Sequence, residues 1–133
     1  VQAMLGAGGE IRCMRDPTRG GLSSALNEIA AQSRAGMAIE EDKIPIHEEV
    51  RGACELLGLD PLYVANEGKL MAIVAPEGAE KILAAMRKHP LGDEAQAIGV
   101  VTDSNSGLVT MRTALGTTRI VDMLAGDQLP RIC

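Results

Sequence analysis

The chain has 133 residues, which suits one domain or a piece of a longer protein but not two well-formed domains. Apolar residues make up 46% and charged residues 23%, as in ordinary globular proteins, and no stretch approaches the about 18 apolar residues of a membrane span. A net charge of −5 and a single aromatic residue, Tyr63, argue against nucleic-acid binding, which usually needs a basic face and aromatic platforms.

The cysteines and histidines indicate neither a disulfide framework nor a metal site. Cys13, Cys54 and Cys133 are odd in number and far apart, so we expect a reducing, cytoplasmic setting. The first two lie on apolar faces and are expected to be small core residues. His47 and His89 are far from each other and from any cysteine pair, so we expect no metal ligands. The chain starts on valine, and we expect its N-terminus to be a domain boundary within a longer protein.

The first half of the chain predicts a strand, a helix, a strand and a helix. Residues 11–14 are extended in pattern, and 19–33 carry apolar residues at helical spacing. Gly36 ends that helix, and 37–40 form the next strand. A second helix is expected to open with Pro45 in its first turn and to stop at Gly58. Its apolar stripe would be Ile46, Val50, Ala53, Cys54 and Leu57.

The second half predicts a helix among several strands. Residues 70–75 are nearly all apolar, as in a central strand, and Pro76 opens a helix that ends near His89. Strands 97–102 and 108–112 are expected to form a hairpin, because the loop between them is polar and ends in glycine. A last strand covers 117–121. The alternation of elements indicates an α/β or α+β fold. We expect one domain over 1–125 and a flexible tail over 126–133.

The first candidate site precedes the first long helix. Thr18 can cap that helix, and Gly20 and Gly21 allow a ligand close to the backbone. Arg19 adds a positive charge beside the helix N-terminus, which already attracts anions. We interpret the segment from Asp16 to Gly21 as a phosphate or carboxylate site. The alternative is an ordinary Pro-Gly turn with a helix cap.

The second candidate is Glu67, in the Asn-Glu-Gly turn of residues 66–68. A carboxylate at the end of a sheet, where active sites collect, could act as a general base if it were partly desolvated. Asn-Glu-Gly is also ordinary turn chemistry, so the residues alone leave open that Glu67 and Lys69 are simply solvated.

The third candidate is Cys133, the last residue of the chain. An exposed free thiol is a liability that proteins usually avoid. From Gly126 an extended tail would reach roughly 23–25 Å, so the thiol could carry a thioester-like group between sites. The alternatives are an arbitrary chain end or a disordered stub.

Three strings carry a resemblance to a known family. Residues 13–22 (CMRDPTRGGL) resemble the signature shared by aminoimidazole ribonucleotide synthetases, selenophosphate synthetases and thiamine-phosphate kinases. Residues 57–69 (LGLDPLYVANEGK) narrow the match, and the closing 130–133 (PRIC) is nearly diagnostic of one branch. Over essentially its whole length the chain resembles the C-terminal domain of the HypE family of hydrogenase expression/formation proteins. The resemblance implies an α+β fold in which a mixed β-sheet packs with helices.

The resemblance also implies a role in making the cyanide ligands of the [NiFe]-hydrogenase iron. In that family a carbamoyltransferase, HypF, loads a carbamoyl group onto the terminal cysteine, and ATP-dependent dehydration gives a thiocyanate. The HypC–HypD pair then receives the nitrile. Carried over, Cys133 would be the carrier thiol and Glu67 the base for the carboxamide N–H proton. The loop facing the nucleotide phosphates would consist of Asp16, Thr18, Arg19, Gly20 and Gly21.

Family members are more than twice as long as this chain. Their N-terminal domain supplies the ATP- and metal-binding carboxylates and the main homodimer contact. We therefore expect ATP and Mg²⁺ to act in the full-length protein, and expect this chain alone neither to bind ATP tightly nor to catalyse dehydration. No nucleic acid or membrane is expected as a partner. The alternative function is a non-catalytic docking module that completes a dimer, and a phosphate-transferring sibling would have no use for a terminal thiol.

Overall fold

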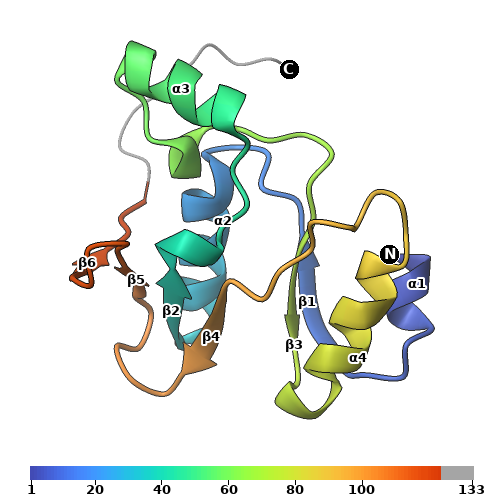
Figure 1. Ribbon diagram of the computed structural model, residues 1–133. Helices are drawn as coiled ribbons and strands as arrows, with labels where there is room; N and C mark the ends of the chain where they lie inside the picture. The colour runs from blue at the N-terminus through green and yellow to red at the C-terminus, as the bar shows by residue number, and fades with distance from the viewer. Residues whose placement is uncertain (124–133) are drawn as a thin grey trace. The chain divides into compact units, whose positions relative to one another are not determined.

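The computed structural model describes residues 1–123, which fall into two compact units (Figure 1). One unit comprises Val1–Arg15 and Leu70–Ala97, and the other comprises, within the described residues, Asp16–Lys69 and residues 98–123. Helices occur with both parallel and antiparallel strand pairs, so the predicted α+β class with a mixed sheet is confirmed. A single domain over 1–125 with a tail over 126–133 stays a prediction.

The first unit contains a two-stranded antiparallel sheet. Strand β1 (Ile11–Arg15) pairs with β3 (Met71–Val74), and the register is irregular between Ile11 and Cys13. Within residues 1–123, β3 has no strand neighbour other than β1, and all four of its residues are half-buried. The expected central strand is therefore wrong, because a short apolar run does not determine how many neighbours a strand has.

Two helices complete the first unit. Helix α4 (Pro76–Arg87) begins with proline at its first position, where the missing N–H costs little. It packs against α1 (Gln2–Leu5), and Ile82 and Met4 of the two helices are each 2% exposed. The structure confirms the helix predicted to open at Pro76. Helix α1 was not predicted, because a helix of about one turn is too short to show a periodic stripe.

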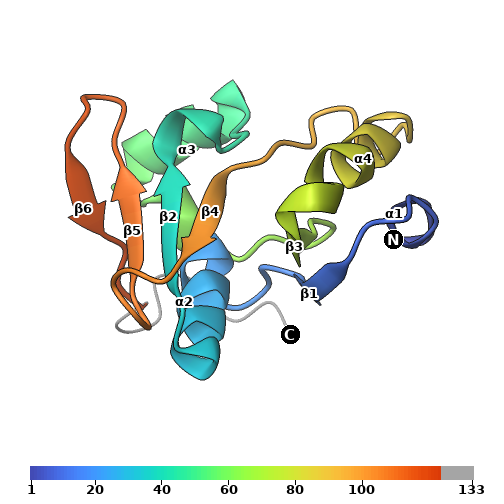
Figure 2. The same cartoon turned by 90° about the horizontal axis from the view of Figure 1, so that it is seen from below.

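The second unit contains a four-stranded mixed sheet in the order β4-β2-β5-β6 (Figure 2). Its strands are β2 (Gly36–Glu40), β4 (Gly99–Thr102), β5 (Val109–Arg112) and β6 (Thr118–Ile120). β2 pairs antiparallel with β4 and parallel with β5, and β5 pairs antiparallel with β6. Each strand lies within a segment predicted to be extended, or one residue beyond it.

The arrangement of β4 and β5 differs from the predicted hairpin. β2 lies between them and bonds to both, so the two strands are not neighbours. Their connecting loop, 103–107, passes the start of β2, where the Ser106 hydroxyl donates to the Arg34 carbonyl (2.5 Å) and Gly107 N–H donates to the Ala35 carbonyl (3.2 Å). A polar loop ending in glycine is compatible with a hairpin. Here, however, β4 and β5 each pair with an edge of β2, which is far away in the sequence.

Helix α2 (Gly21–Ser33) packs against β2 and β5. The buried apolar side chains of these three elements are Ala25, Leu26, Ala30, Met37, Ile39, Val109 and Met111. The helix predicted over 19–33 is confirmed, although it begins two residues later. Its buried stripe against the sheet forms the core of the second unit.

The segment after β2 departs from prediction. A 3-10 turn, η1 (Glu41–Lys43), comes first, and α3 (Glu48–Leu57) starts only afterwards. Ile44 is extended (φ −81°, ψ 114°) because Pro45 follows it, and a residue before proline avoids the helical region. Pro45 therefore lies outside the helix. Gly58 ends α3 in the left-handed conformation (φ 66°), as predicted.

The apolar stripe of α3 is only partly buried. Cys54 is 6% exposed, as expected of a small core residue, whereas Val50 is 46% and Leu57 70% exposed. Cys13 is half-buried, so the expectation of a core position holds fully for Cys54 alone. Of the predicted stripe, Ile46 lies before α3, and within the described unit Cys54 alone is buried.

Candidate functional site

The first candidate segment is a loop that leads into α2. Pro17 and Gly21 are buried and Thr18 is half-buried, whereas Asp16 and Arg19 are exposed. The loop is therefore held at its proline and its last glycine, and its two charged side chains reach solvent.

Two glycines in the left-handed region carry this loop into the helix. Gly20 (φ 66°) occupies the N-cap position and Gly21 (φ 63°) is the first residue of α2. No side chain caps the helix, so the predicted cap by Thr18 is wrong. The glycine pair places Thr18 outside the first turn. The first amides of a helix have no partner within it, and its dipole is positive at this end, so the N-terminus of α2 can attract an anion.

Gly21 lies against a second 3-10 turn, η2 (Pro61–Tyr63). A Cβ atom on Gly21 would lie 2.4 Å from the Leu62 carbonyl oxygen and 2.7 Å from that of Val64. Both are backbone atoms, which cannot rotate away as a side chain would. Only glycine fits here, and the start of α2 is thereby held against the segment that leads to Glu67.

A backbone hydrogen bond joins the two candidate motifs. The Asn66 N–H donates to the Pro17 carbonyl oxygen over 3.0 Å. The turn that carries Glu67 therefore lies next to the loop of residues 16–21. Both motifs were singled out from the sequence, but their contact was not predicted. Glu67 itself is exposed in the described chain, as is Lys69.

Together these segments offer groups for an anion and a group for a proton. Arg19 and the amides at the start of α2 suit phosphate oxygens, and the Glu67 carboxylate can accept a proton. Arg19 and Glu67 are both exposed, so water reaches these groups in the described residues. Among residues 1–123 no three His, Cys, Asp or Glu side chains gather as a metal ion would require.

Two further observations concern the sequence predictions. Cys133, the third candidate, lies outside the described residues, as does the rest of 126–133. No helix within residues 1–123 is both long enough and apolar enough to pass through a bilayer.

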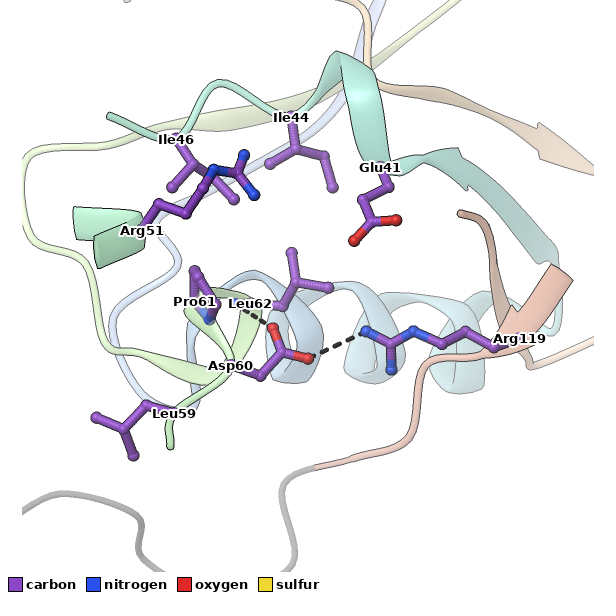
Figure 3. Close-up of a pocket in the computed structure, with 9 residues that line it drawn as sticks. All are labelled: Glu41, Ile44, Ile46, Arg51, Leu59, Asp60, Pro61, Leu62 and Arg119. Carbon is purple, nitrogen blue, oxygen red and sulfur yellow. Dashed lines mark hydrogen bonds and ion pairs between the residues drawn. The ribbon is translucent and has the colours of Figure 1, made fainter. Parts of the chain in front are cut away.

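Asp60 and Arg119, which were not predicted from the sequence, hold η2 in place (Figure 3). Asp60 accepts a hydrogen bond from Leu62 N–H (2.9 Å) at one carboxylate oxygen and from the Arg119 guanidinium (3.0 Å) at the other. Asp followed by Pro at the start of a turn is a local signal that could have been noticed. The pairing with Arg119 joins residues 59 positions apart and has no such signal.

A pocket of about 280 Å³ lies beside this ion pair (Figure 3). It is lined by Glu41, Ile44, Ile46, Arg51, Leu59, Asp60, Pro61, Leu62 and Arg119. Its surface is therefore part aliphatic and part charged. This pocket was not predicted from the sequence.

The match to known proteins begins with the family. Residues 1–112 match the family described as AIR synthase related protein, C-terminal domain, and the chain belongs to that family. This confirms the superfamily that the string at residues 13–22 indicated.

Within that family the resemblance is to HypE. The chain is 60% identical over 134 residues to the carbamoyl dehydratase HypE of Rhizobium leguminosarum bv. viciae, covering 100% of this chain and 38% of that protein. It is also 60% identical over 133 residues to the carbamoyl dehydratase HypE of Azotobacter vinelandii, covering 100% of this chain and 39% of that protein. The chain thus spans about two-fifths of the length of these relatives.

Solved structures agree with the sequence relatives. A crystal structure of the hydrogenase maturation protein HypE matches with a TM-score of 0.89 at 50% identity, covering 97% of this chain and 42% of that one. HypE in complex with ATP gives 0.86 at 50% identity, covering 94% and 38%. The HypE–HypF complex gives 0.86 at 45% identity, covering 92% and 40%. The predicted resemblance to the C-terminal domain of HypE is confirmed.

Proposed function

We propose that this chain is the C-terminal part of an ATP-dependent carbamoyl dehydratase of [NiFe]-hydrogenase maturation. It would carry a carbamoyl group on Cys133 and, with the N-terminal part that its relatives have, dehydrate that group to a thiocyanate. The observation that carries the proposal is the Asn66–Pro17 hydrogen bond, which brings a carboxylate turn to an anion-attracting loop. The names of the relatives support the reaction.

The proposed reaction needs two proton losses and one activated oxygen. The carboxamide oxygen attacks the γ-phosphorus of ATP, ADP leaves, and the nitrogen gives up its first proton to the solvent. The Glu67 carboxylate then takes the second N–H proton, the C–O bond breaks, phosphate leaves, and the C≡N bond forms. Overall, an S-carboxamide and ATP become a thiocyanate, ADP, phosphate and one proton.

The described residues divide this work between them. Arg19 and the N-terminus of α2 would stabilise negative charge on the phosphates, and Glu67 would act as the base. Glu67 is exposed in this chain. Water must be kept from the activated oxygen, so the N-terminal part or the loaded tail would have to cover Glu67 during the reaction.

The partners follow from the same proposal. A HypF-type carbamoyltransferase would load Cys133, and a HypC–HypD pair would take the nitrile. The full-length protein would work as a homodimer with Mg²⁺ in the cytoplasm. The complexes of related HypE proteins with HypF and with ATP support this partner and this nucleotide.

Two substitutions in the full-length protein test the assignment, with intact mass as the readout. Cys133→Ala should abolish carbamoyl loading without unfolding the domain, and loading that persists would refute the carrier role. Glu67→Gln should load normally but dehydrate about 10²–10⁴-fold more slowly, the usual contribution of a general base. Glu55→Gln, at an exposed position of α3, is the matched control. Dehydration at the normal rate in Glu67→Gln would exclude Glu67 as the base.

The exposure of Glu67 and of the α3 stripe favours one alternative, a non-catalytic docking module that completes a dimer. The same Glu67→Gln variant separates the two functions, because a docking module would tolerate it. For the isolated chain we expect no tight binding of Mg-ATP by calorimetry. Tight binding to these 133 residues would show that the nucleotide site is complete without the N-terminal part.

A further inference from the structure

The ion pair of Asp60 with Arg119 is a feature of the second unit to which the proposed reaction gives no role. Arg119 belongs to β6, and its guanidinium donates to one carboxylate oxygen of Asp60 over 3.0 Å (Figure 3). Asp60 is the N-cap residue of η2, and its other oxygen accepts the Leu62 N–H over 2.9 Å. One carboxylate therefore caps η2 and ties this turn to the sheet.

This ion pair is too exposed to contribute much to the stability of the whole fold. The Arg119 side chain is 42% exposed, and the Asp60 side chain is 35% exposed. Ion pairs between such side chains contribute little, because water screens both charges. The contribution of the pair is therefore local, to the position of the turn that Asp60 begins.

The position of η2 in turn affects the position of Glu67. Only residues 64–66 separate η2 from Glu67 along the chain. Within this short connection the Asn66 N–H donates to the Pro17 carbonyl (3.0 Å), next to the loop of residues 16–21. Three residues span at most about 11 Å, so a shift of η2 moves Glu67 relative to that loop.

Helix α2 has anchors of its own, separate from this ion pair. The Asn27 side chain donates to the Val121 carbonyl (2.8 Å), and the Ser23 hydroxyl donates to that of Asp122 (2.6 Å). The helix also packs against β2 and β5. Loss of the ion pair would therefore leave the anion-attracting start of α2 in place and would displace η2 and the turn after it.

We propose that Arg119 is a positioning residue for the dehydration, acting through Asp60 and η2 on Glu67. In this role Arg119 needs no contact with the phosphates or the carboxamide, because it acts by holding the base beside the loop of residues 16–21. The inference rests on the proposed function of Glu67 as the base. A displaced turn can still return to its place, so the loss of rate is limited to what an exposed ion pair contributes, about two- to fivefold.

Substitutions in the full-length protein test this role through the dehydration of the carbamoyl-loaded protein. Arg119→Gln should lower the rate at saturating ATP about two- to fivefold. Carbamoyl loading and the ATP concentration that gives half the maximal rate should not change. Arg119→Lys keeps the charge and should lose less of the rate. Arg112→Gln is the matched control, because it breaks an exposed ion pair with Glu40 on the neighbouring strand β5, and a rate of Arg119→Gln equal to that of this control would overturn the proposal.

A double-mutant cycle tests whether the two residues act as a pair. Asp60→Asn has one acceptor oxygen, which the Leu62 N–H occupies, so this variant loses the ion pair and keeps the cap. Arg119→Gln and Asp60→Asn combined should dehydrate as slowly as either variant alone. Losses of rate that multiply in the double variant would overturn the ion pair as the cause.

Hydrogen exchange of the segment that contains Asn66 tests the structural link independently of the reaction. Arg119→Gln should accelerate this exchange about two- to fivefold, because a displaced η2 weakens the bond from the Asn66 N–H to Pro17. Unchanged exchange would overturn the positioning role alone. The base is tested separately by Glu67→Gln, and adding Arg119→Gln to that variant should slow dehydration no further. Dehydration at the normal rate in Glu67→Gln would overturn the proposed base, whatever the exchange shows.

Discussion

Replacing Gly21 with alanine tests the contact between α2 and η2. The new Cβ would lie 2.4 Å from the Leu62 carbonyl oxygen and 2.7 Å from that of Val64, well inside van der Waals contact. Gly21 also has φ +63°, a conformation that costs an L-residue about 1–2 kcal/mol. Overpacking against atoms that cannot rotate away adds about 1–3 kcal/mol. We expect Gly21→Ala to lower the free energy of unfolding by about 2–5 kcal/mol.

Gly58 provides the matched control. Its φ is +66°, but a Cβ there would meet nothing within 4 Å. Gly58→Ala should therefore cost only the conformational part, about 1–2 kcal/mol. Urea unfolding followed by circular dichroism compares the two variants. Hydrogen exchange of the Asn66 amide should accelerate in Gly21→Ala alone, because displaced η2 weakens the bond from Asn66 to Pro17. Equal losses of stability and unchanged exchange would refute the argument.

Two further predictions concern glycines in the helices and the loss of stability at acid pH. In α4, a Cβ on Gly78 would lie 2.7 Å from a backbone carbon, so Gly78→Ala should lower the free energy of unfolding by about 1–3 kcal/mol. In α3, a Cβ on Gly52 would meet nothing within 4 Å, so Gly52→Ala should raise the free energy of unfolding by about 0.5–1 kcal/mol. Urea titrations that show a change of the same sign for Gly78→Ala and Gly52→Ala would contradict these two predictions. Hydrogen bonds from Lys43 and then from Arg112 lower the pKa of the Glu40 carboxyl. These hydrogen bonds stabilise the fold above the ordinary Glu pKa, and their contribution is lost as the pH falls through the lowered pKa of Glu40. Glu40→Gln should therefore reduce the fall of Tm with pH in this acid range. A fall of Tm equal to that of the unmodified protein would count against the pairing of Glu40 with Lys43 and Arg112.

Local signals in the sequence accounted for most of the elements. The stripes of α2 and α4 and the glycine after α3 were all recognisable because each depends on neighbours within a few residues. The late start of α3 was also a local matter, since Ile44 stands before a proline. The β4–β5 hairpin failed for a different reason. Its loop chemistry was compatible with a hairpin, but β2 offered each strand a better partner from far away in the chain.

The candidate site divides in the same way. The loop of residues 16–21 and the turn that carries Glu67 could be selected by composition, because glycine, arginine and a carboxylate suggest their chemistry. Their contact depends on one backbone bond between Asn66 and Pro17, and backbone groups look alike in every residue. The ion pair of Asp60 with Arg119 is equally non-local. Such pairings become visible only when the chain is folded.

The place of β2 inside its sheet has a consequence for synthesis of the chain. Met37 lies opposite Val101 on one side and Val109 on the other, so both neighbours emerge from the ribosome more than sixty residues later. Until then both edges of β2 have unpaired N–H and C=O groups, which can pair with other nascent chains. Translation speed and chaperone supply should therefore affect the yield of this protein more than that of one whose strands pair in order of synthesis.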